Sequence, residues 1–160
     1  MKKQDINFDC LGQHNWVGWR EWVALPELGV PAVKAKLDTG ARTSALHVAD
    51  LETVETQDGL QVRFVLHPLR KRPQIELACQ AQVIDQRVVR DSGGHQERRY
   101  VIRTPVRLGQ RQWPIELTLT NRDNMLFRML LGRTAMQGWV IDPQHSYRYG
   151  RSLRHCYHKS

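Results

Sequence analysis

Apolar and polar side chains alternate along several stretches of this chain, and the alternation restricts the fold more than any other feature of the sequence. A period of two places successive side chains on opposite faces of an extended strand, whereas one face of a helix repeats every three to four residues. The sequence therefore predicts a mainly β domain with minimal helix. The pattern is clearest where Trp113, Ile115, Leu117 and Leu119 alternate with Pro114, Glu116, Thr118 and Thr120.

The same pattern, interrupted by turn residues, predicts the order of the strands. Residues 16–25 are rich in aromatic and β-branched side chains, and the turn at residues 26–29 leads into residues 33–37. Adjacent glycines at residues 93 and 94 can adopt the positive φ that a hairpin tip requires. Further strands are expected at residues 42–48, 62–66, 113–120 and 138–142, a hairpin over 75–108 with its tip at 91–96, a helical turn at 134–137, a polar loop at 50–60 and a basic connector at 68–73.

Length and cysteine content indicate one intracellular domain. A chain of 160 residues can bury a core without disulfide or metal cross-links. Its three cysteines are widely spaced and odd in number, which is typical of the reducing cytoplasm. No apolar run reaches about 18 residues and no signal peptide is visible, so we expect no membrane partner. We divide the chain into a flexible N-terminal arm (1–14), one domain (15–145) and a basic C-terminal tail (146–160).

One short motif, Leu37-Asp38-Thr39-Gly40-Ala41, has a clear chemical meaning. It places a carboxylate directly after a predicted strand, on a turn that glycine allows to be tight. Asp-x-Gly is also ordinary turn chemistry, in which the aspartate only accepts backbone hydrogen bonds. The triplet by itself therefore favours a structural aspartate, and the remaining motifs have to decide whether Asp38 is catalytic.

The order of those motifs resembles that of the retropepsins, the single-domain homodimeric aspartic proteases. Asp38-Thr39-Gly40 follows an apolar strand, a glycine-tipped hairpin lies at residues 90–98, and Leu130-Leu131-Gly132-Arg133 precedes a short helix. The likeness covers residues 16–142. It implies a single-domain retropepsin-like closed β-barrel or sandwich with one short C-terminal helix.

The chain resembles one bacterial branch of this fold more closely, the RimB-like proteins often labelled putative ATP-dependent zinc proteases. The sequence supports neither zinc nor ATP, because it lacks both the His-Glu-x-x-His motif and the Gly-x-x-x-x-Gly-Lys-Ser/Thr motif. His155-Cys156-Tyr157-His158 has no partner cluster, so we expect no metal and no cofactor. The likeness rests on residues 36–47, 97–102, 119–122 and 129–133.

The retropepsin likeness implies that Asp38 is one half of a catalytic pair. Two aspartates about 3 Å apart cannot both ionise, so they share a proton and can act as base and acid on a water and a peptide bond. The chain has one Asp-Thr-Gly, so the second carboxylate would be Asp38 of another subunit in a homodimer. Thr39 would hydrogen-bond across the dimer. The other supporting residues implied by the likeness are Gly40, Ala41, Leu131 and Gly132.

The likeness also makes the hairpin tip a flap that closes over substrate. Seven arginines lie between residues 87 and 111, against only Asp91 and Glu97. Guanidinium groups pair with carboxylates in a bidentate manner, so an acidic peptide suits such a flap. RimB-like proteins are linked with ligases that add glutamate tails, which implies a glutamate-rich or poly-glutamate substrate. The predicted substrate-binding residues are Arg90, Ser92, Gly93, Arg98 and Arg99, whereas Arg103, Arg107 and Arg111 are interpreted as a solvated strand face.

The charge of the whole chain leaves a second interpretation open. A formal net charge of +8 at pH 7 attracts anions of several kinds. A non-catalytic basic β module that binds an acidic protein or RNA would use Arg70-Lys71-Arg72 and residues 147–159. No nucleic-acid-binding motif accompanies these cations, so the peptidase is favoured.

Overall fold

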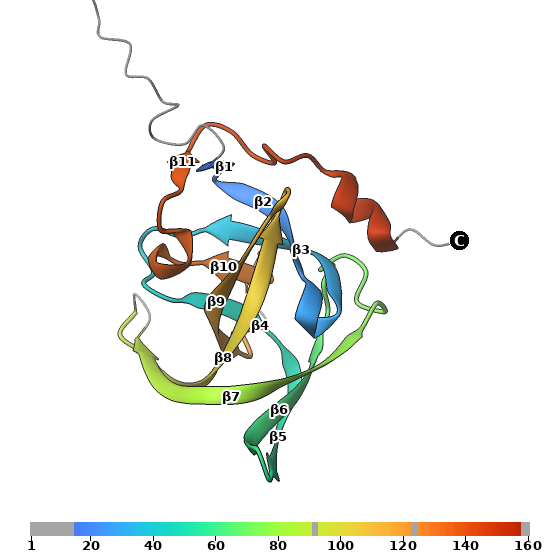
Figure 1. The fold of residues 1–160 in the computed structure, drawn as a ribbon, viewed down its shortest axis with the longest axis vertical. Helices are drawn as coiled ribbons and strands as arrows, with labels where there is room; N and C mark the ends of the chain where they lie inside the picture. Colours follow the sequence, from blue (N-terminus) through green and yellow to red (C-terminus); the bar gives the residue numbers. More distant parts are fainter. Residues whose placement is uncertain (1–14, 91–92, 123–124, 158–160) are drawn as a thin grey trace, which may run out of the picture.

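The computed structural model describes residues 15–90, 93–122 and 125–157, which form a mainly β domain as predicted (Figure 1). The predicted N-terminal arm and Ser92 lie outside these residues. No helix in the described part of the chain is long and apolar enough to cross a membrane. The strands are β1 (Trp16–Gly18), β2 (Arg20–Leu25), β3 (Val30–Leu37), β4 (Ser44–His47), β5 (Ala49–Thr56), β6 (Gly59–Leu66), β7 (Leu77–Arg90), β8 (Gln96–Leu108), β9 (Arg111–Thr120), β10 (Met129–Leu131) and β11 (Val140–Asp142). The 3-10 helices are η3 (Pro26–Leu28), η4 (Arg133–Met136) and η5 (Ser152–Tyr157).

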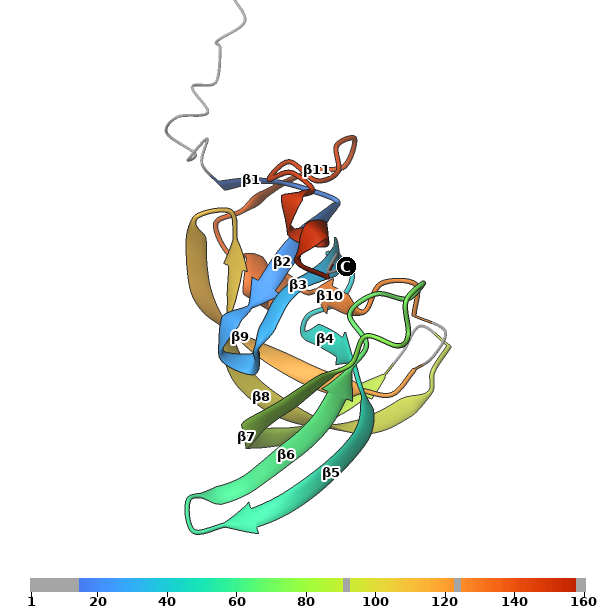
Figure 2. The same cartoon turned by 90° about the vertical axis from the view of Figure 1, so that its right-hand side faces the viewer.

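Nine strands form one sheet, in the order β2-β3-β10-β4-β9-β8-β7-β6-β5. A further pairing between β2 and β8, at Ala24 and Arg107, closes the first six strands of that order into a barrel. The predicted closed barrel is therefore present. The remaining strands continue as a curved extension, and the β5–β6 hairpin projects from the barrel (Figure 2).

Burial follows the alternation from which the strands were predicted. In β9, Ile115, Leu117 and Leu119 are buried and Glu116 is exposed, but Thr118 and Thr120 at the end of the strand are buried as well. In β3, Lys34 and Lys36 are exposed and alternate with buried Val33, Ala35 and Leu37. Fully burying a large aliphatic side chain contributes about 1.5–3 kcal/mol, so the inward faces of these strands supply the driving force that closes the barrel.

One prediction was wrong, since most of the region predicted as a polar loop at residues 50–60 is strand β5. None of its residues is buried, so it lacks the apolar alternation that reveals a strand with one face in the core. Its backbone pairs antiparallel with β6 instead, from Ala49 with Val65 to Thr56 with Gly59. Gly59, with φ of 113°, closes the tight turn between the two strands.

The segment after β11 packs along the β2–β3 hairpin. Buried Glu21 accepts hydrogen bonds from the backbone N–H groups of Gly18 (2.7 Å), Arg148 (3.1 Å) and Tyr149 (3.2 Å). The Tyr157 hydroxyl donates to the Ala32 carbonyl and accepts from the Ala32 N–H. Burial raises the pKa of Tyr157 to about 12, although the hydrogen bond with the Ala32 backbone opposes this shift. Residues 148–157 are thus tied to the strand that leads to Asp38.

Replacing the buried carboxylate tests this tie. Glu21→Gln turns one of the two acceptor oxygens into an N–H₂ donor that faces backbone donors, so we expect the free energy of unfolding to fall by about 2–3 kcal/mol. Urea unfolding measures the change. Glu27→Gln, at an exposed position on η3, is the matched control and should change stability by less than about 0.5 kcal/mol. Equal losses in both variants would contradict the role of Glu21.

Candidate functional site

Asp38 follows the end of two paired strands. β3 and β10 run parallel, with Leu37 opposite Leu131, and the Asp38 N–H donates to the Leu131 carbonyl at 2.8 Å. β10 also pairs antiparallel with β4, so it lies between the strands before and after the Asp38 turn. Leu37 and Leu131 are buried, which anchors the aspartate to the core.

The turn leaves one carboxylate oxygen available. Asp38 Oδ1 accepts from the Gly40 N–H at 3.0 Å, and the Ala41 N–H donates to the Asp38 carbonyl at 3.2 Å. Within the described residues, Oδ2 accepts no hydrogen bond and the Thr39 hydroxyl makes none. Asp38 is half-buried, whereas Thr39 and Gly40 are exposed. The carboxylate therefore lies at the surface on a turn whose hydroxyl is free to reach another molecule.

Gly132 permits the close packing behind the turn. A Cβ atom at this position would lie 2.6 Å from the Thr43 carbonyl carbon and 2.9 Å from the Arg42 carbonyl oxygen. Its N–H donates to buried Ser44 Oγ at 3.1 Å. Ser44, which the sequence did not single out as a site residue, thus fixes β10 against β4.

The residues after Gly132 hold the far side of the turn. The Arg133 N–H donates to the Ala41 carbonyl at 2.9 Å, and Arg133 Nη1 donates to the Thr39 carbonyl at 2.9 Å. The Thr134 N–H and hydroxyl both donate to the Arg42 carbonyl, at 3.1 and 2.8 Å. The start of η4 therefore holds the Asp38 turn through backbone carbonyls.

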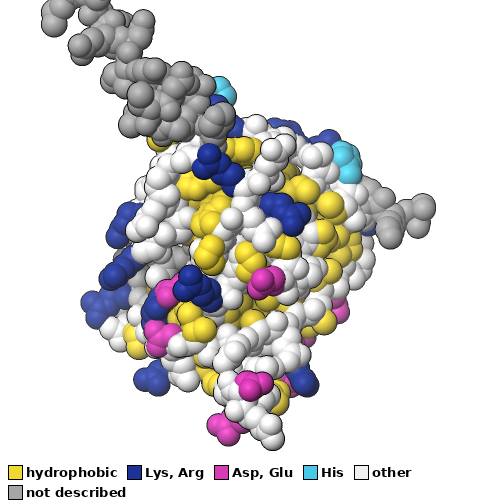
Figure 3. Space-filling view, in the orientation of Figure 1, with side chains coloured by type: hydrophobic (Ala, Val, Ile, Leu, Met, Phe, Trp, Pro, Cys, Tyr) yellow, Lys and Arg dark blue, Asp and Glu magenta, His cyan; other side chains and the backbone are white. Residues whose placement is uncertain are grey.

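A cleft of about 620 Å³ separates the Asp38 turn from the β7–β8 hairpin. In Figure 1 the tip of this hairpin lies beside the turn between β3 and β4. In the same orientation, Figure 3 shows Lys and Arg side chains along the left edge of the molecule, where that tip lies. The residues that line the cleft include Gly40, Ala41, Arg42, Thr43, Arg87, Arg90, Arg99, Glu116 and Leu130.

Two of the four cleft arginines are already neutralised. Arg87 binds Glu116 (2.6 Å) and Asp85 (2.9 Å). The Arg87–Glu116 hydrogen bond raises the pKa of Arg87 and lowers that of Glu116. Arg99 is buried and binds Glu97 at 2.9 Å. Neither guanidinium offers a free charge to a ligand.

The other two cleft arginines keep their charge. Arg42 is exposed and forms no ion pair within the described residues. Arg90 lies against the side-chain amide of Gln96, which is a neutral group. Within the described residues, the cleft therefore presents positive charge without an ion-pair partner both from Arg42 on the Asp38 turn and from Arg90 on the hairpin.

The predicted flap residues divide between different environments. Arg90 and Arg99 line the cleft, whereas Arg98 is exposed and is not among the lining residues. Gly93 is exposed at the hairpin tip, and Ser92 lies outside the described residues. Arg42 was not predicted to bind substrate, although its position directly after Ala41 was the signal that could have indicated it.

A small hollow of about 170 Å³ adjoins Asp38 on the side of η4 and β11. It is lined by Asp38, Thr39, Leu131, Gly132, Arg133, Met136, Trp139 and Ile141. Trp139 and Ile141 are only half-buried, so apolar surface is open beside the carboxylate. Within the part of the chain that the structure describes, no three His, Cys, Asp or Glu side chains lie together as metal ligands would.

Comparison with known proteins shows which family the chain belongs to. Residues 16–151 match the model of the RimB-like family, described as retropepsin-like aspartic endopeptidase RimB. A solved structure of a Legionella pneumophila protein of unknown function is similar in fold, with a TM-score of 0.69 and 24% identity over 83% of this chain and 96% of that one.

Curated relatives are named probable alpha-L-glutamate ligases. The chain is 48% identical over 128 residues to one from Desulfotalea psychrophila, and 45% identical over 135 residues to one from Shewanella pealeana. These matches cover 79% and 84% of this chain but only 28% and 30% of the relatives. The chain thus spans less than a third of the length of the proteins to which that name belongs.

Adding a methyl group at Gly132 tests the packing behind the turn. Gly132→Ala forces the Thr43 backbone to move, so we expect a loss of about 1–3 kcal/mol in the free energy of unfolding. The control is Gly94→Ala, where no atom lies within 4 Å of the new Cβ but φ is 82°. Its loss should stay near the roughly 1 kcal/mol of the left-handed conformation.

Both variants are measured by urea unfolding. Amide hydrogen exchange at residues 38–44 separates the two effects, because only Gly132→Ala should accelerate exchange there. Unchanged exchange in that variant would show that the turn does not depend on the Gly132 contact.

Proposed function

Because the chain belongs to the RimB-like family of retropepsin-like aspartic endopeptidases, we propose that it is an aspartic peptidase with Asp38 as its catalytic residue. The observation that carries the proposal is the half-buried Asp38 carboxylate on a turn whose Gly40 and Ala41 line the cleft. One of its oxygens accepts from the Gly40 N–H, and the other has no hydrogen-bond partner within the described residues. A carboxylate held in this way is oriented but remains able to take a proton.

The reaction requires a second carboxylate, which a homodimer would supply as the partner's Asp38. The ionised member of the pair takes a proton from a water molecule while the oxygen of that water attacks the peptide carbonyl carbon. At the same time the protonated member gives its proton to the carbonyl oxygen. The tetrahedral diol then collapses and the C–N bond breaks. The carboxyl group that took the water proton gives it to the leaving amine nitrogen, and one diol hydroxyl returns its proton to the other carboxylate, which restores the shared proton. Each subunit thus contributes half of the site.

Two features around the turn support this dimer. The exposed Thr39 hydroxyl has no partner within the described residues, as expected of a group that bonds across a two-fold axis. The apolar hollow beside Asp38 offers about 170 Å³ for a side chain of the second subunit. Both lie at the carboxylate itself, so dimerisation and assembly of the site would be one event.

For the substrate we propose acidic peptides, in particular glutamate-rich or poly-glutamate tails of proteins. The uncompensated guanidinium groups of Arg42 and Arg90 would bind carboxylates along the cleft. The names of the curated relatives agree with this substrate, because a glutamate ligase makes the glutamyl bond that such a peptidase would hydrolyse.

Removing the acid–base function of Asp38 tests the reaction. Asp38→Asn should lower cleavage of a glutamate-tailed peptide by about 10³-fold, because asparagine neither accepts nor donates the proton. Mass spectrometry of the products at several pH values between about 4 and 7 measures the rates.

Analytical ultracentrifugation of the same samples checks the dimer. We expect both proteins to be dimers, since the substitution keeps the shape of the side chain. An active monomer, or equal cleavage by wild type and variant, would refute the mechanism. A wild type that cleaves no peptide would instead favour the non-catalytic module.

Charge removal at one rim of the cleft tests the substrate class. Arg42→Gln should lower kcat/KM for an acidic peptide by about tenfold or more, the value of one charge-assisted hydrogen bond, and change a neutral peptide little. Arg98→Gln removes the same charge from an exposed position that does not line the cleft, and should have a much smaller effect. Similar losses for the two variants would argue for a general effect of net charge.

A further inference from the structure

Cations and aromatic rings are stacked along the β2–β3 hairpin, apart from the Asp38 cleft. The Arg20 guanidinium lies 4.5 Å from the Trp19 ring centroid and 4.9 Å from that of Tyr147. Arg151 lies 4.7 Å from the Tyr147 ring, which gives the order ring, cation, ring, cation. Guanidinium groups favour such ring faces, and the stack orients both cations.

More cations converge on the same surface from three parts of the chain. Lys34 lies on β3, with its ammonium 5.4 Å from the Trp22 ring centroid, and Arg154 lies on η5. Lys71 belongs to the connector between β6 and β7, which Arg72 ties to η5 through the Tyr157 carbonyl at 3.1 Å. Figure 1 shows η5 and this connector on the same side of the β2–β3 hairpin. We call Arg20, Lys34, Lys71, Arg151 and Arg154 the β2–β3 basic surface.

The positive charge of this surface is not compensated. Within the described residues none of its five cations forms an ion pair. Burial lowers the pKa of Lys34, and the other four cations lower it further. Like charges held together in this way favour a bound polyanion, which would relieve their repulsion.

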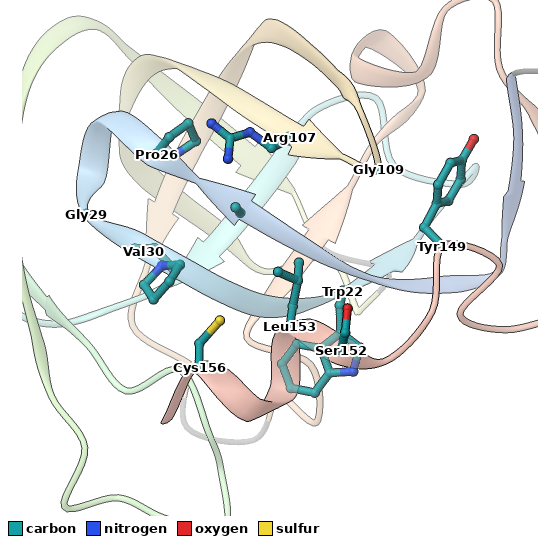
Figure 4. A pocket seen from close by; sticks show the side chains of 12 residues that line it. Trp22, Pro26, Gly29, Val30, Arg107, Gly109, Tyr149, Ser152, Leu153 and Cys156 are labelled. Carbon is teal, nitrogen blue, oxygen red and sulfur yellow. The ribbon is translucent and has the colours of Figure 1, made fainter. Parts of the chain in front are cut away.

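An apolar groove of about 630 Å³ borders the basic surface (Figure 4). Trp22, the ring under Lys34, lines it, and so does Leu153, which lies between Arg151 and Arg154 in η5. Leu153 and Cys156 project from η5 toward the β2–β3 hairpin. Pro26, Val30 and Pro31 line the groove where β2 turns into β3. The groove begins at the start of β3 and Asp38 follows the end of β3, so the strand separates the groove from the carboxylate. The basic surface extends further along the hairpin, because Arg20 pairs with Lys36 in the β2–β3 register.

The backbone at Tyr147 is held in an uncommon conformation. Its φ is 55°, in the left-handed region that costs a residue with a side chain about 1–2 kcal/mol. Its N–H donates to the Arg20 carbonyl at 2.9 Å, and its carbonyl accepts from the Gly150 N–H at 2.9 Å. These bonds place the ring between Arg20 and Arg151.

We propose that the β2–β3 basic surface and the adjoining groove bind single-stranded nucleic acid, with phosphates on the cations and a base in the groove. A basic track beside aromatic and apolar surface is the arrangement by which proteins hold single strands, because every base has an apolar face and every phosphate a charge. An acidic peptide would complement the charge of the cations but not the apolar surface of the groove. Its glutamate side chains have no flat apolar group to occupy a groove lined by Trp22, Pro31 and Leu153.

Fluorescence anisotropy with a labelled oligouridylate of about twelve nucleotides tests the proposal. The variant carries both Lys34→Gln and Arg154→Gln, and its control carries both Arg63→Gln and Arg103→Gln, at exposed positions outside the surface. At about 0.1 M salt we expect the Kd of the first variant for the oligonucleotide to rise about tenfold. The slope of the logarithm of the binding constant against the logarithm of salt concentration should become shallower by about 1.4, because each of the two lost phosphate contacts contributes about 0.7. The control should stay within about twofold of wild type, and Asp38→Asn should bind as wild type.

Cys156 reports on the groove. Its thiol is exposed, whereas the Cys79 thiol is buried with a pKa raised to about 11, so in a Cys10→Ser background alkylation should occur at Cys156. Saturating oligonucleotide should slow that alkylation severalfold. An unchanged alkylation rate, an equal loss of binding in the control variant, no saturable binding, or binding of a poly-glutamate peptide as tight as that of the oligonucleotide would each overturn the proposal.

Discussion

The insertion of β10 between β3 and β4 is the constraint on which the rest of the site depends. It lets the Asp38 N–H bond to Leu131, brings the start of η4 to the carbonyls of residues 39–42, and places Gly132 against Thr43. Three paired strands, β3, β10 and β4, thus hold the turn from the core side. These contacts make the backbone around the Asp38 carboxylate rigid. Two such carboxylates in a dimer would need fixed positions in order to share a proton.

The positions of a few carboxylates decide which of the basic side chains are paired and which are available on two surfaces of the domain. Asp85, Glu97 and Glu116 neutralise Arg87 and Arg99, which makes those arginines part of the hairpin framework. No carboxylate of the described residues pairs with Arg42, nor with the cations of the β2–β3 basic surface. Charge that is already paired stabilises the fold, and charge that is left unpaired is available to ligands. A cleft at one end of β3 and a groove at the other can therefore take different anions.

Strand β9, which has a face in the core, could be predicted from its alternation, whereas β5, which has none, could not. β9 alternates apolar and polar residues because one of its faces closes the barrel, whereas β5 contributes no buried residue and is held by backbone pairing with β6. The arginines of the predicted flap show the same limit. Arg98 and Arg99 are equivalent in sequence, yet strand geometry turns them to opposite faces, so Arg99 is buried beside Glu97 and Arg98 is exposed.

The sequence by itself determined the β class, the Asp-Thr-Gly turn and the order of motifs that carries the family likeness, because these depend on local periodicity and on turn chemistry. Only the tertiary structure decided which arginines keep a free charge and that the segment after β11 lies along β2–β3 beside a groove. These features depend on contacts between residues far apart in the chain, such as Arg87 with Glu116 and Glu21 with Tyr149. Such contacts leave no local pattern, because each partner meets the other only when the barrel closes.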